Sequence, residues 1–163
     1  MIQLKSWKEI GLFFSSLVIC QAPGLFGAYY TSQSIPTWYA GLVKPSFAPP
    51  NEIYAPVWIT LYLLMGFSLY IVWRRPANLE RDRALGFFFF QLALNALWPL
   101  LFFGLHFMWI SFGAILLLWT AILFACILFY PLARLATWLL LPYLAWVTFA
   151  VFLNYRIVRL NGL

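Results

Sequence analysis

The chain has 163 residues, of which 65% are hydrophobic and 9% are charged, and its formal net charge is +6. A soluble domain is typically about 45–50% apolar and about 25% charged, so this composition excludes a soluble globule, and its high hydrophobicity excludes a disordered chain. What remains is a small integral membrane protein with a heavy aromatic load of 9 Trp, 9 Tyr and 17 Phe residues.

Five stretches are long and apolar enough to cross a bilayer, which requires about 20 residues of helix. None of them contains Asp, Glu, Lys or Arg. The expected spans are residues 10–30, 54–73, 84–104, 107–130 and 135–155. The sequence therefore predicts an all-α integral membrane protein in which residues 1–163 form one domain, a bundle of five transmembrane helices with a long ordered first loop.

The first span competes with a cleaved signal peptide, because Lys5 and Lys8 precede the apolar run. The run continues past Cys20 to Tyr30, and the bulky Ile19 stands where a cleavage site prefers a small residue. We therefore expect a retained helix. Cys20 and Cys126 have no motif spacing and are expected to be buried structural thiols.

The first loop, residues 31–53, is long but poor in the Gly, Ser and charge of a flexible linker. It contains Trp38, Tyr39 and four prolines, and Thr37 is expected to cap a short helical turn through Leu42. Two interpretations remain open. The loop forms an ordered lid, which we favour, or Trp38 and Tyr39 lie at the level of the lipid headgroups.

Basic residues predict the orientation. The N-terminus, second loop and fourth loop share one side of a five-span protein, and that side holds seven of the 10 Lys and Arg residues. These are Lys5, Lys8, Arg74, Arg75, Arg81, Arg83 and Arg134, against Lys44, Arg156 and Arg159 on the other side. The positive-inside rule predicts a cytoplasmic N-terminus, with the first loop and the C-terminus outward. Because these residues flank spans, nucleic acid is not an expected partner.

Polar side chains at membrane depth are few. Gln91 and Asn95 are four residues apart on one face of the third helix, and Trp98 and Pro99 follow. The amides serve either as hydrogen-bonding contacts between helices, which the chemistry alone favours, or as polar groups in the wall of a ligand cavity. No charged group lies within a span, which argues against a proton relay. The single histidine, His106, predicts no metal site.

The tryptophans fall into groups by depth. Trp7, Trp73 and Trp138 lie near span ends and are typical of an interfacial aromatic belt. Within the spans lie Trp58, with Tyr62 on its face, Trp98, Trp119 and Trp146. A buried indole N–H usually has a hydrogen-bond partner. Plain packing and an aromatic-walled pocket for a flat apolar ligand both explain these residues.

Several motifs, in the same order along nearly the whole chain, resemble the TspO/translocator protein family, also called tryptophan-rich sensory proteins or peripheral-type benzodiazepine receptors. The motifs are Pro23–Gly27, Trp38-Tyr39 with Lys44–Pro50, Pro56–Trp58 with Leu61–Gly66, Gln91–Asn95 with Trp98-Pro99 and Phe102–Gly104, Leu141–Trp146, and Leu153–Tyr155. Each motif is modest by itself, and their common order makes the resemblance specific.

The resemblance implies a five-helix bundle, commonly a homodimer, whose first loop closes over a pocket. Members bind protoporphyrin IX, haem and benzodiazepine-type ligands, and animal members bind cholesterol. By analogy the pocket residues are Trp38, Tyr39, Pro49, Trp58, Tyr62, Asn95, Trp98, Trp146 and Ala150. Some bacterial relatives degrade porphyrin in light, a chemistry assigned to the tryptophans that match Trp58 and Trp146.

The chain departs from many bacterial members at two places. It has Phe47 where they have Trp, and Phe112-Gly113-Ala114 where they carry an Asp in the fourth helix. The weak sterol-binding pattern of Leu153, Tyr155 and Arg159 is present.

The leading hypothesis is a membrane receptor or sensor that binds porphyrin or haem as a ligand and requires no cofactor. Sterols and benzodiazepine-type molecules are additional candidate ligands. The alternatives are a light- and oxygen-dependent porphyrin-degrading enzyme and a tetrapyrrole or sterol transporter. The absence of acids and bases at membrane depth disfavours the enzyme, and the absence of inverted repeats disfavours the transporter. A homodimer is expected by resemblance, and Ala93 and Ala96 on the third helix permit close contact.

Overall fold

The computed structural model describes residues 7–161, which form five long helices. They are α1 (Trp7–Ser34), α2 (Asn51–Trp73), α3 (Leu79–Pro99), α4 (Met108–Leu132) and α5 (Arg134–Asn161). A one-turn 3₁₀ helix, η1 (Tyr39–Gly41), lies in the first loop, and a π-helical turn, η2 (Leu100–Gly104), extends α3. All five helices are long and apolar enough to cross a membrane, which confirms the predicted fold.

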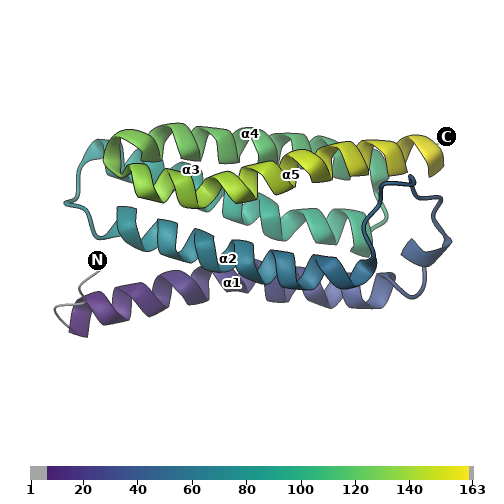
Figure 1. Cartoon of the computed structure of the whole chain (residues 1–163), viewed down its shortest axis with the longest axis horizontal. Coiled ribbons are helices and arrows are strands. Elements are labelled where there is room, and N and C mark those ends of the chain that lie inside the picture. The colour runs from purple at the N-terminus through teal and green to yellow at the C-terminus, as the bar shows by residue number, and fades with distance from the viewer. Residues whose placement is uncertain (1–6, 162–163) are drawn as a thin grey trace.

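The helices form a closed ring around a common interior. α1 packs on α2, α2 on α5, α5 on α4, α4 on α3, and α3 on α1. Figure 1 shows the start of α1, the α2–α3 connection and the α4–α5 corner at one end of the bundle, and the first loop and the C-terminus at the other end. We call these the corner end and the loop end.

The predicted spans match the five helices, but most of the helices are longer. α1 and α5 have 28 residues each, and α5 continues to Asn161 rather than ending at residue 155. At 1.5 Å per residue, 28 residues extend about 42 Å, which exceeds the roughly 30 Å of hydrocarbon. Hydrophobicity along the sequence shows only the part of a helix that lies in the hydrocarbon. The helical hydrogen bonds of the backbone continue into the charged flanking residues, such as Arg156 and Arg159.

Local chemistry explains where helices begin and end. Asn78 caps α3, since its side-chain oxygen accepts a hydrogen bond from the Arg81 N–H at 2.8 Å. Pro99 lacks an N–H for the preceding turn, and the helix then widens into η2, where the Leu105 N–H bonds the Leu100 carbonyl at 2.8 Å. Pro131 lies in the last turn of α4, one residue beyond the predicted span 107–130.

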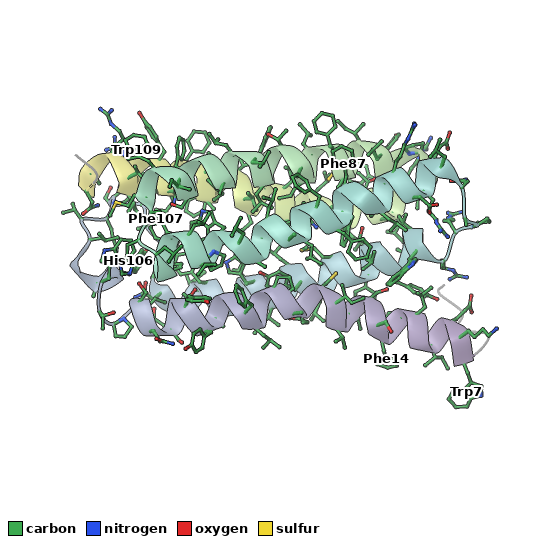
Figure 2. All side chains as sticks on the ribbon, turned by 180° about the vertical axis from the view of Figure 1, so that it is seen from behind. Trp7, Phe14, Phe87, His106, Phe107 and Trp109 are labelled. Atoms are coloured by element: carbon green, nitrogen blue, oxygen red, sulfur yellow. The ribbon has the colours of Figure 1, made fainter. Side chains whose placement is uncertain are left out.

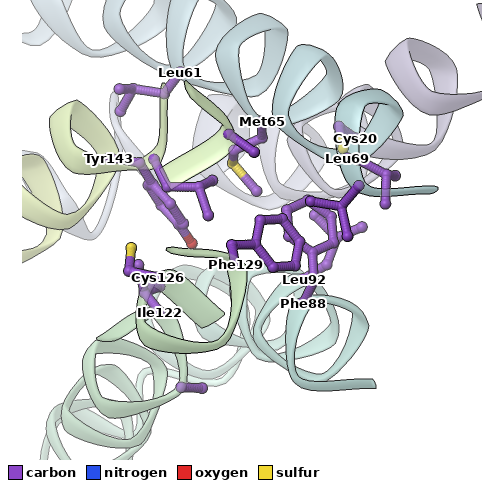
Figure 3. Close-up of a cluster of buried hydrophobic side chains, with 14 of the residues drawn as sticks. Cys20, Leu61, Met65, Leu69, Phe88, Leu92, Ile122, Cys126, Phe129 and Tyr143 are labelled. Carbon is purple, nitrogen blue, oxygen red and sulfur yellow. The ribbon is translucent and has the colours of Figure 1, made fainter. Parts of the chain in front are cut away.

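The corner half of the bundle is densely filled. Phe88 of α3 stacks on Phe129 of α4 with ring centroids 5.6 Å apart, and Met65 and Leu69 of α2 belong to the same buried cluster (Figure 3). The Ser68 hydroxyl donates a hydrogen bond to the Ala136 carbonyl at 2.8 Å, which joins α2 to α5. Cys20 and Cys126 are free, buried thiols, as expected.

The outer faces carry large apolar side chains, as a lipid environment allows. Trp7 and Phe14 project outward from α1 and Phe87 from α3 (Figure 2). Trp7 and Trp138 are exposed near the corner end, whereas Trp73 is half-buried against Phe89. These positions agree with the expected aromatic belt.

Candidate ligand cavity

A cavity of about 440 Å³ occupies the loop half of the bundle. Residues from the first loop, all five helices and η2 line it. Within residues 7–161, its lining includes no Asp, Glu, Lys, Arg or His. Cavities that bind small molecules are usually about 300–1,000 Å³ and mostly apolar with a few polar groups, and this cavity has that character.

Seven of the nine pocket residues expected from sequence line this cavity. They are Tyr39, Trp58, Tyr62, Asn95, Trp98, Trp146 and Ala150. Trp38 and Pro49 do not line it. Both are half-buried in the first loop, and the Trp38 indole stacks on His106 and meets Phe102 edge-on at 5.3 Å. The structure therefore brings together residues from the loop, α2, α3 and α5 that lie far apart in the chain.

Stacked aromatic rings form two walls of the cavity. On α2, Trp58 stacks on Tyr62 with centroids 5.4 Å apart and 28° between the planes. On α3 and η2, Trp98 stacks on Phe102 with centroids 5.1 Å apart and 9° between the planes. Such flat surfaces suit a flat ligand, because face-to-face contact buries the most apolar area.

The indole N–H groups divide by function. Trp98 donates to the Ser111 carbonyl at 3.1 Å, and Trp119 donates to the Thr148 hydroxyl at 2.8 Å, so both serve helix packing. Among the described residues, neither the Trp58 nor the Trp146 indole donates a hydrogen bond to protein. These two cavity residues therefore keep their polar edge available.

A chain of four polar side chains crosses the bundle at the inner end of the cavity. Tyr62 donates to Asn95 Oδ1 at 2.6 Å, Asn95 Nδ2 donates to the Tyr143 hydroxyl at 2.7 Å, and Tyr143 donates to Gln91 Oε1 at 3.0 Å. The network joins α2, α3 and α5, so the amides do connect helices. Asn95 also lines the cavity, so both sequence interpretations apply to it.

Glycines let α1 close the side of the cavity. A Cβ at Gly24 would lie 2.5 Å from Tyr62 Cε2, and a Cβ at Gly27 would lie 2.9 Å from Pro99 Cγ. Only glycine permits α1 to approach the rings of α2 and α3 this closely.

The first loop is held over the loop end by specific contacts. Trp38 stacks on His106 with centroids 4.1 Å apart and 15° between the planes, and His106 has a left-handed backbone (φ 57°) that places its ring there. Farther along, the Val43 N–H donates to Asn161 Oδ1 and Asn161 Nδ2 donates to the Val43 carbonyl, both at 2.8 Å. The loop is thereby connected to the α3–α4 turn and to the end of α5.

Tyr39 anchors the short η1 turn inside the cap. Its ring packs edge-on against Phe103 at 5.5 Å, and Lys44 Nζ lies 4.7 Å from the ring centroid. Burial raises the pKa of the Tyr39 phenol, and the nearby Tyr54 hydroxyl lowers it in part. The predicted cap by Thr37 was wrong, because its hydroxyl donates to the Gln33 carbonyl of α1 at 2.8 Å, and η1 begins after Trp38.

Several cavity residues escaped the sequence analysis, notably Tyr54, Phe102, Phe149 and Asn154. A signal for Asn154 was present, since Trp146, Ala150 and Asn154 recur every four residues and share one face of α5. The same signal was present for Phe102, which follows Trp98 by four residues and stacks on it.

The sterol-pattern residues do not form one surface. Leu153 is buried and lines the cavity. Tyr155 is exposed on another face of α5, where it contacts Phe112 of α4 at 5.5 Å, and Arg159 is exposed one turn beyond it. Phe47, which replaces the bacterial Trp, is exposed and meets Phe149 edge-on at 6.3 Å.

Comparison with known proteins places the chain among membrane proteins of one family. A model of the TspO/MBR family matches residues 16–160. The chain is similar to the tryptophan-rich protein TspO of Archaeoglobus fulgidus, at 42% identity over 91% of this chain and 95% of the relative. It is similar to the human translocator protein at 42% identity over 76% of this chain and 75% of that protein. It is also 36% identical to a tryptophan-rich sensory protein of Cereibacter sphaeroides, covering 92% and 91% of the two chains.

Proposed function

Because the chain belongs to the TspO/MBR family and is a multi-pass membrane protein, we propose that it is a receptor or sensor whose cavity binds a porphyrin such as protoporphyrin IX or haem. The observation that supports this most is the uncharged, aromatic-walled cavity of about 440 Å³ beneath an ordered loop. Sterols and benzodiazepine-type molecules, which the resemblance also implies, are further candidate ligands for the same apolar space.

Binding is driven by burial of the flat macrocycle against indole and phenol rings. A Trp or Tyr side chain buries roughly 150–250 Å², and apolar burial contributes about 25 cal/mol per Å². Trp58, Tyr62 and Trp146 then supply an upper limit on the order of 10 kcal/mol, before the cost of ordering ligand and loop. We expect micromolar affinity, for which about 8 kcal/mol suffices.

Tryptophan fluorescence tests the proposal. Protoporphyrin IX should quench the emission of the detergent-purified chain and saturate at one ligand per chain. The double variant Trp58→Phe with Trp146→Phe should weaken binding severalfold, while Trp7→Phe with Trp138→Phe removes as many indoles from the outer surface and should leave the dissociation constant unchanged. An unchanged titration in the first variant contradicts the cavity as the porphyrin site.

Photo-oxidative breakdown of porphyrin is a second candidate function. It is favoured by the two cavity tryptophans, Trp58 and Trp146, whose N–H groups make no bond to protein in the described part of the chain. Illuminated protein with protoporphyrin IX and oxygen should then yield a new absorbing product that the Trp146→Phe variant does not form. Bleaching at the same rate without protein removes this candidate.

We also propose an orientation with the corner end in the cytoplasm. Arg74, Arg75, Arg83 and Arg134 lie at that end, and Arg74 pairs with Glu9 at 3.2 Å. Lys5 lies outside the described residues. The cavity then opens toward the opposite side. A single cysteine introduced at exposed Ser46, in a chain free of its two native thiols, should react with a membrane-impermeant reagent in intact cells.

A homodimer is the expected assembly, through α3. Ala93 is exposed and Ala96 half-exposed, and with Ala22 and Pro23 of α1 they line a shallow groove on the outer surface. Such small residues allow close helix contact in membranes. Ala93→Trp should convert a dimer into a monomer, as measured by light scattering of the detergent-solubilised protein.

A further inference from the structure

Asn154 is a buried amide that makes no hydrogen bond. It lies in the cavity wall on α5 with 3% of its surface exposed, and neither Nδ2 nor Oδ1 has a partner in the part of the chain that the structure describes. Buried polar groups in proteins are almost always hydrogen-bonded, so such a group requires an explanation. Within residues 7–161, Gln91 and Ser34 also have an unpartnered buried atom, but neither lines the cavity.

The position of Asn154 separates it from the polar network at the inner end of the cavity. Tyr143, which joins that network, lies 11 residues earlier on α5, about 16 Å along the helix axis. Ala150 and Trp146 precede Asn154 at intervals of four residues and line the cavity with it. The amide therefore stands at the loop end of the aromatic chamber. Tyr54, another lining residue, also has a buried hydroxyl that makes no hydrogen bond within residues 7–161.

Asn95 provides the contrast within the same cavity. Both atoms of its amide are engaged, Oδ1 by Tyr62 and Nδ2 by Tyr143. Asn95 thus stabilises the fold, whereas Asn154 contributes no bond to it. An amide that is kept in an apolar membrane interior without a structural bond is suited to bond a molecule that enters the cavity.

The cavity lining limits which ligand groups can lie beside the Asn154 amide. In the described part of the chain it contains no cationic side chain to compensate a buried carboxylate, so the propionates of a bound porphyrin must lie outside the cavity, in water or at the headgroups. The two N–H groups of the amide complement a neutral carbonyl oxygen. We propose that Asn154 determines specificity by donating a hydrogen bond from Nδ2 to an uncharged carbonyl group at the edge of a flat ligand. This inference rests on the proposed porphyrin-type function.

A pair of matched ligands tests the inference directly. Protoporphyrin IX dimethyl ester carries neutral carbonyls on its edge, while octaethylporphyrin is a macrocycle of the same kind with alkyl edges only. Asn154→Leu should weaken the ester about tenfold, as expected for loss of one buried hydrogen bond. The same variant should change octaethylporphyrin binding by less than about twofold. Asn154→Ala, which adds no bulk, is measured with both ligands so that the result does not depend on the fit of leucine.

Thermal unfolding of the ligand-free protein distinguishes this role from a structural one. Asn154→Leu should leave the melting temperature unchanged or raise it, because an unsatisfied amide is replaced by an apolar side chain. The matched control Asn95→Leu should lower it, because Tyr62 and Tyr143 lose their shared partner. A fall for Asn154→Leu as large as for Asn95→Leu overturns the inference.

The ligand outcomes also separate this inference from the proposed function. If the wild-type chain binds both porphyrins and the Asn154 variants weaken both equally, or neither, the inference is overturned while porphyrin binding stands. If the wild-type chain binds protoporphyrin IX but not its dimethyl ester, the inference is overturned while the proposed function stands. If it binds no porphyrin, the proposed function fails and the inference falls with it. Selective loss of the ester in both variants is the result that supports it.

Discussion

The two halves of the bundle are built from the same five helices, yet the corner half is filled and the loop half is hollow. In the corner half, the buried side chains of Phe88 and Phe129 stack between the helices, and the Ser68 hydroxyl donates a hydrogen bond to the backbone of α5. In the loop half, rings stand against the helices that carry them and surround about 440 Å³ of space. The comparison shows that helix number and hydrophobicity do not determine whether a membrane bundle has a cavity.

The difference comes from how the rings are supported. Tyr62 is held by its bond to Asn95, and Tyr143 by bonds to Asn95 and Gln91, so movement of either ring into the space would strain buried hydrogen bonds. After Pro99 the helix widens into the π-helical turn, in which Phe102 stacks on Trp98. The polar bonds that hold these rings thus help to keep the loop half open, whereas Phe88, Phe129 and aliphatic side chains fill the corner half.

The largest effect is expected from Gly66→Leu in the filled half. A Cβ at Gly66 would lie 2.7 Å from Leu17 Cδ2 and 3.0 Å from Leu17 Cα, so α1 must move away from α2. Overpacking against backbone should lower the free energy of unfolding by about 3 kcal/mol. Denaturant unfolding in mixed micelles measures this, with exposed Gly86→Leu on α3, where no atom lies within 4 Å of an added Cβ, as the control. Equal stability of the two variants would show that the corner half is not tightly packed.

A smaller loss is expected from Tyr143→Phe at the boundary between the halves. Removal of the hydroxyl leaves Asn95 Nδ2 and Gln91 Oε1 buried without partners, which should cost about 2 kcal/mol of stability. Tyr155→Phe, at an exposed site on the same helix, is the matched control. If thermal unfolding shows no difference between the two variants, the network does not hold the rings of the cavity in place.

Gly24→Ala should affect binding more than stability. Its Cβ would displace the Tyr62 ring, and the ring has the cavity to move into, so the stability cost should be about 1 kcal/mol. The displaced ring narrows the cavity, and the dissociation constant for protoporphyrin IX should rise severalfold in the fluorescence titration. Unchanged affinity would mean that the ligand does not occupy the space beside Tyr62.

The smallest effect is expected from Asn161→Ala at the edge of the hollow half. Loss of the two bonds to Val43 should lower global stability by less than about 1 kcal/mol, because this site is partly exposed. The local effect should be clear, since the Val43 amide loses its acceptor. Hydrogen exchange at Val43 should accelerate while exchange in α2 stays slow, and unchanged protection at Val43 would show that other contacts hold the loop.

Much of the cavity could be inferred from the sequence, for reasons that differ between residues. Trp58, Tyr62, Asn95 and Trp146 stand at helical intervals within spans, and the family motifs place them at a pocket. Trp38 and Pro49 were expected beside them, but a loop residue has no helical period to predict its direction, and Trp38 lies outside the lining, between His106 and Phe102. Tyr54 and Asn154 lie at the ends of the predicted spans, and Asn154 shares the helical period of Trp146 and Ala150, but neither residue was assigned to the pocket.

By itself, the sequence determined that this protein has five membrane-spanning helices, because uninterrupted apolar runs in lipid must satisfy their backbone bonds as helices. Only the tertiary structure decided that one half is hollow, because packing depends on which rings are held back by bonds from other helices. It alone distinguished Asn95 from Asn154 in the cavity wall: Asn95 has partners 33 and 48 residues away, and Asn154 has none among the described residues. Hydrogen bonds between distant segments have no periodic signal in the chain, so only the folded arrangement reveals them.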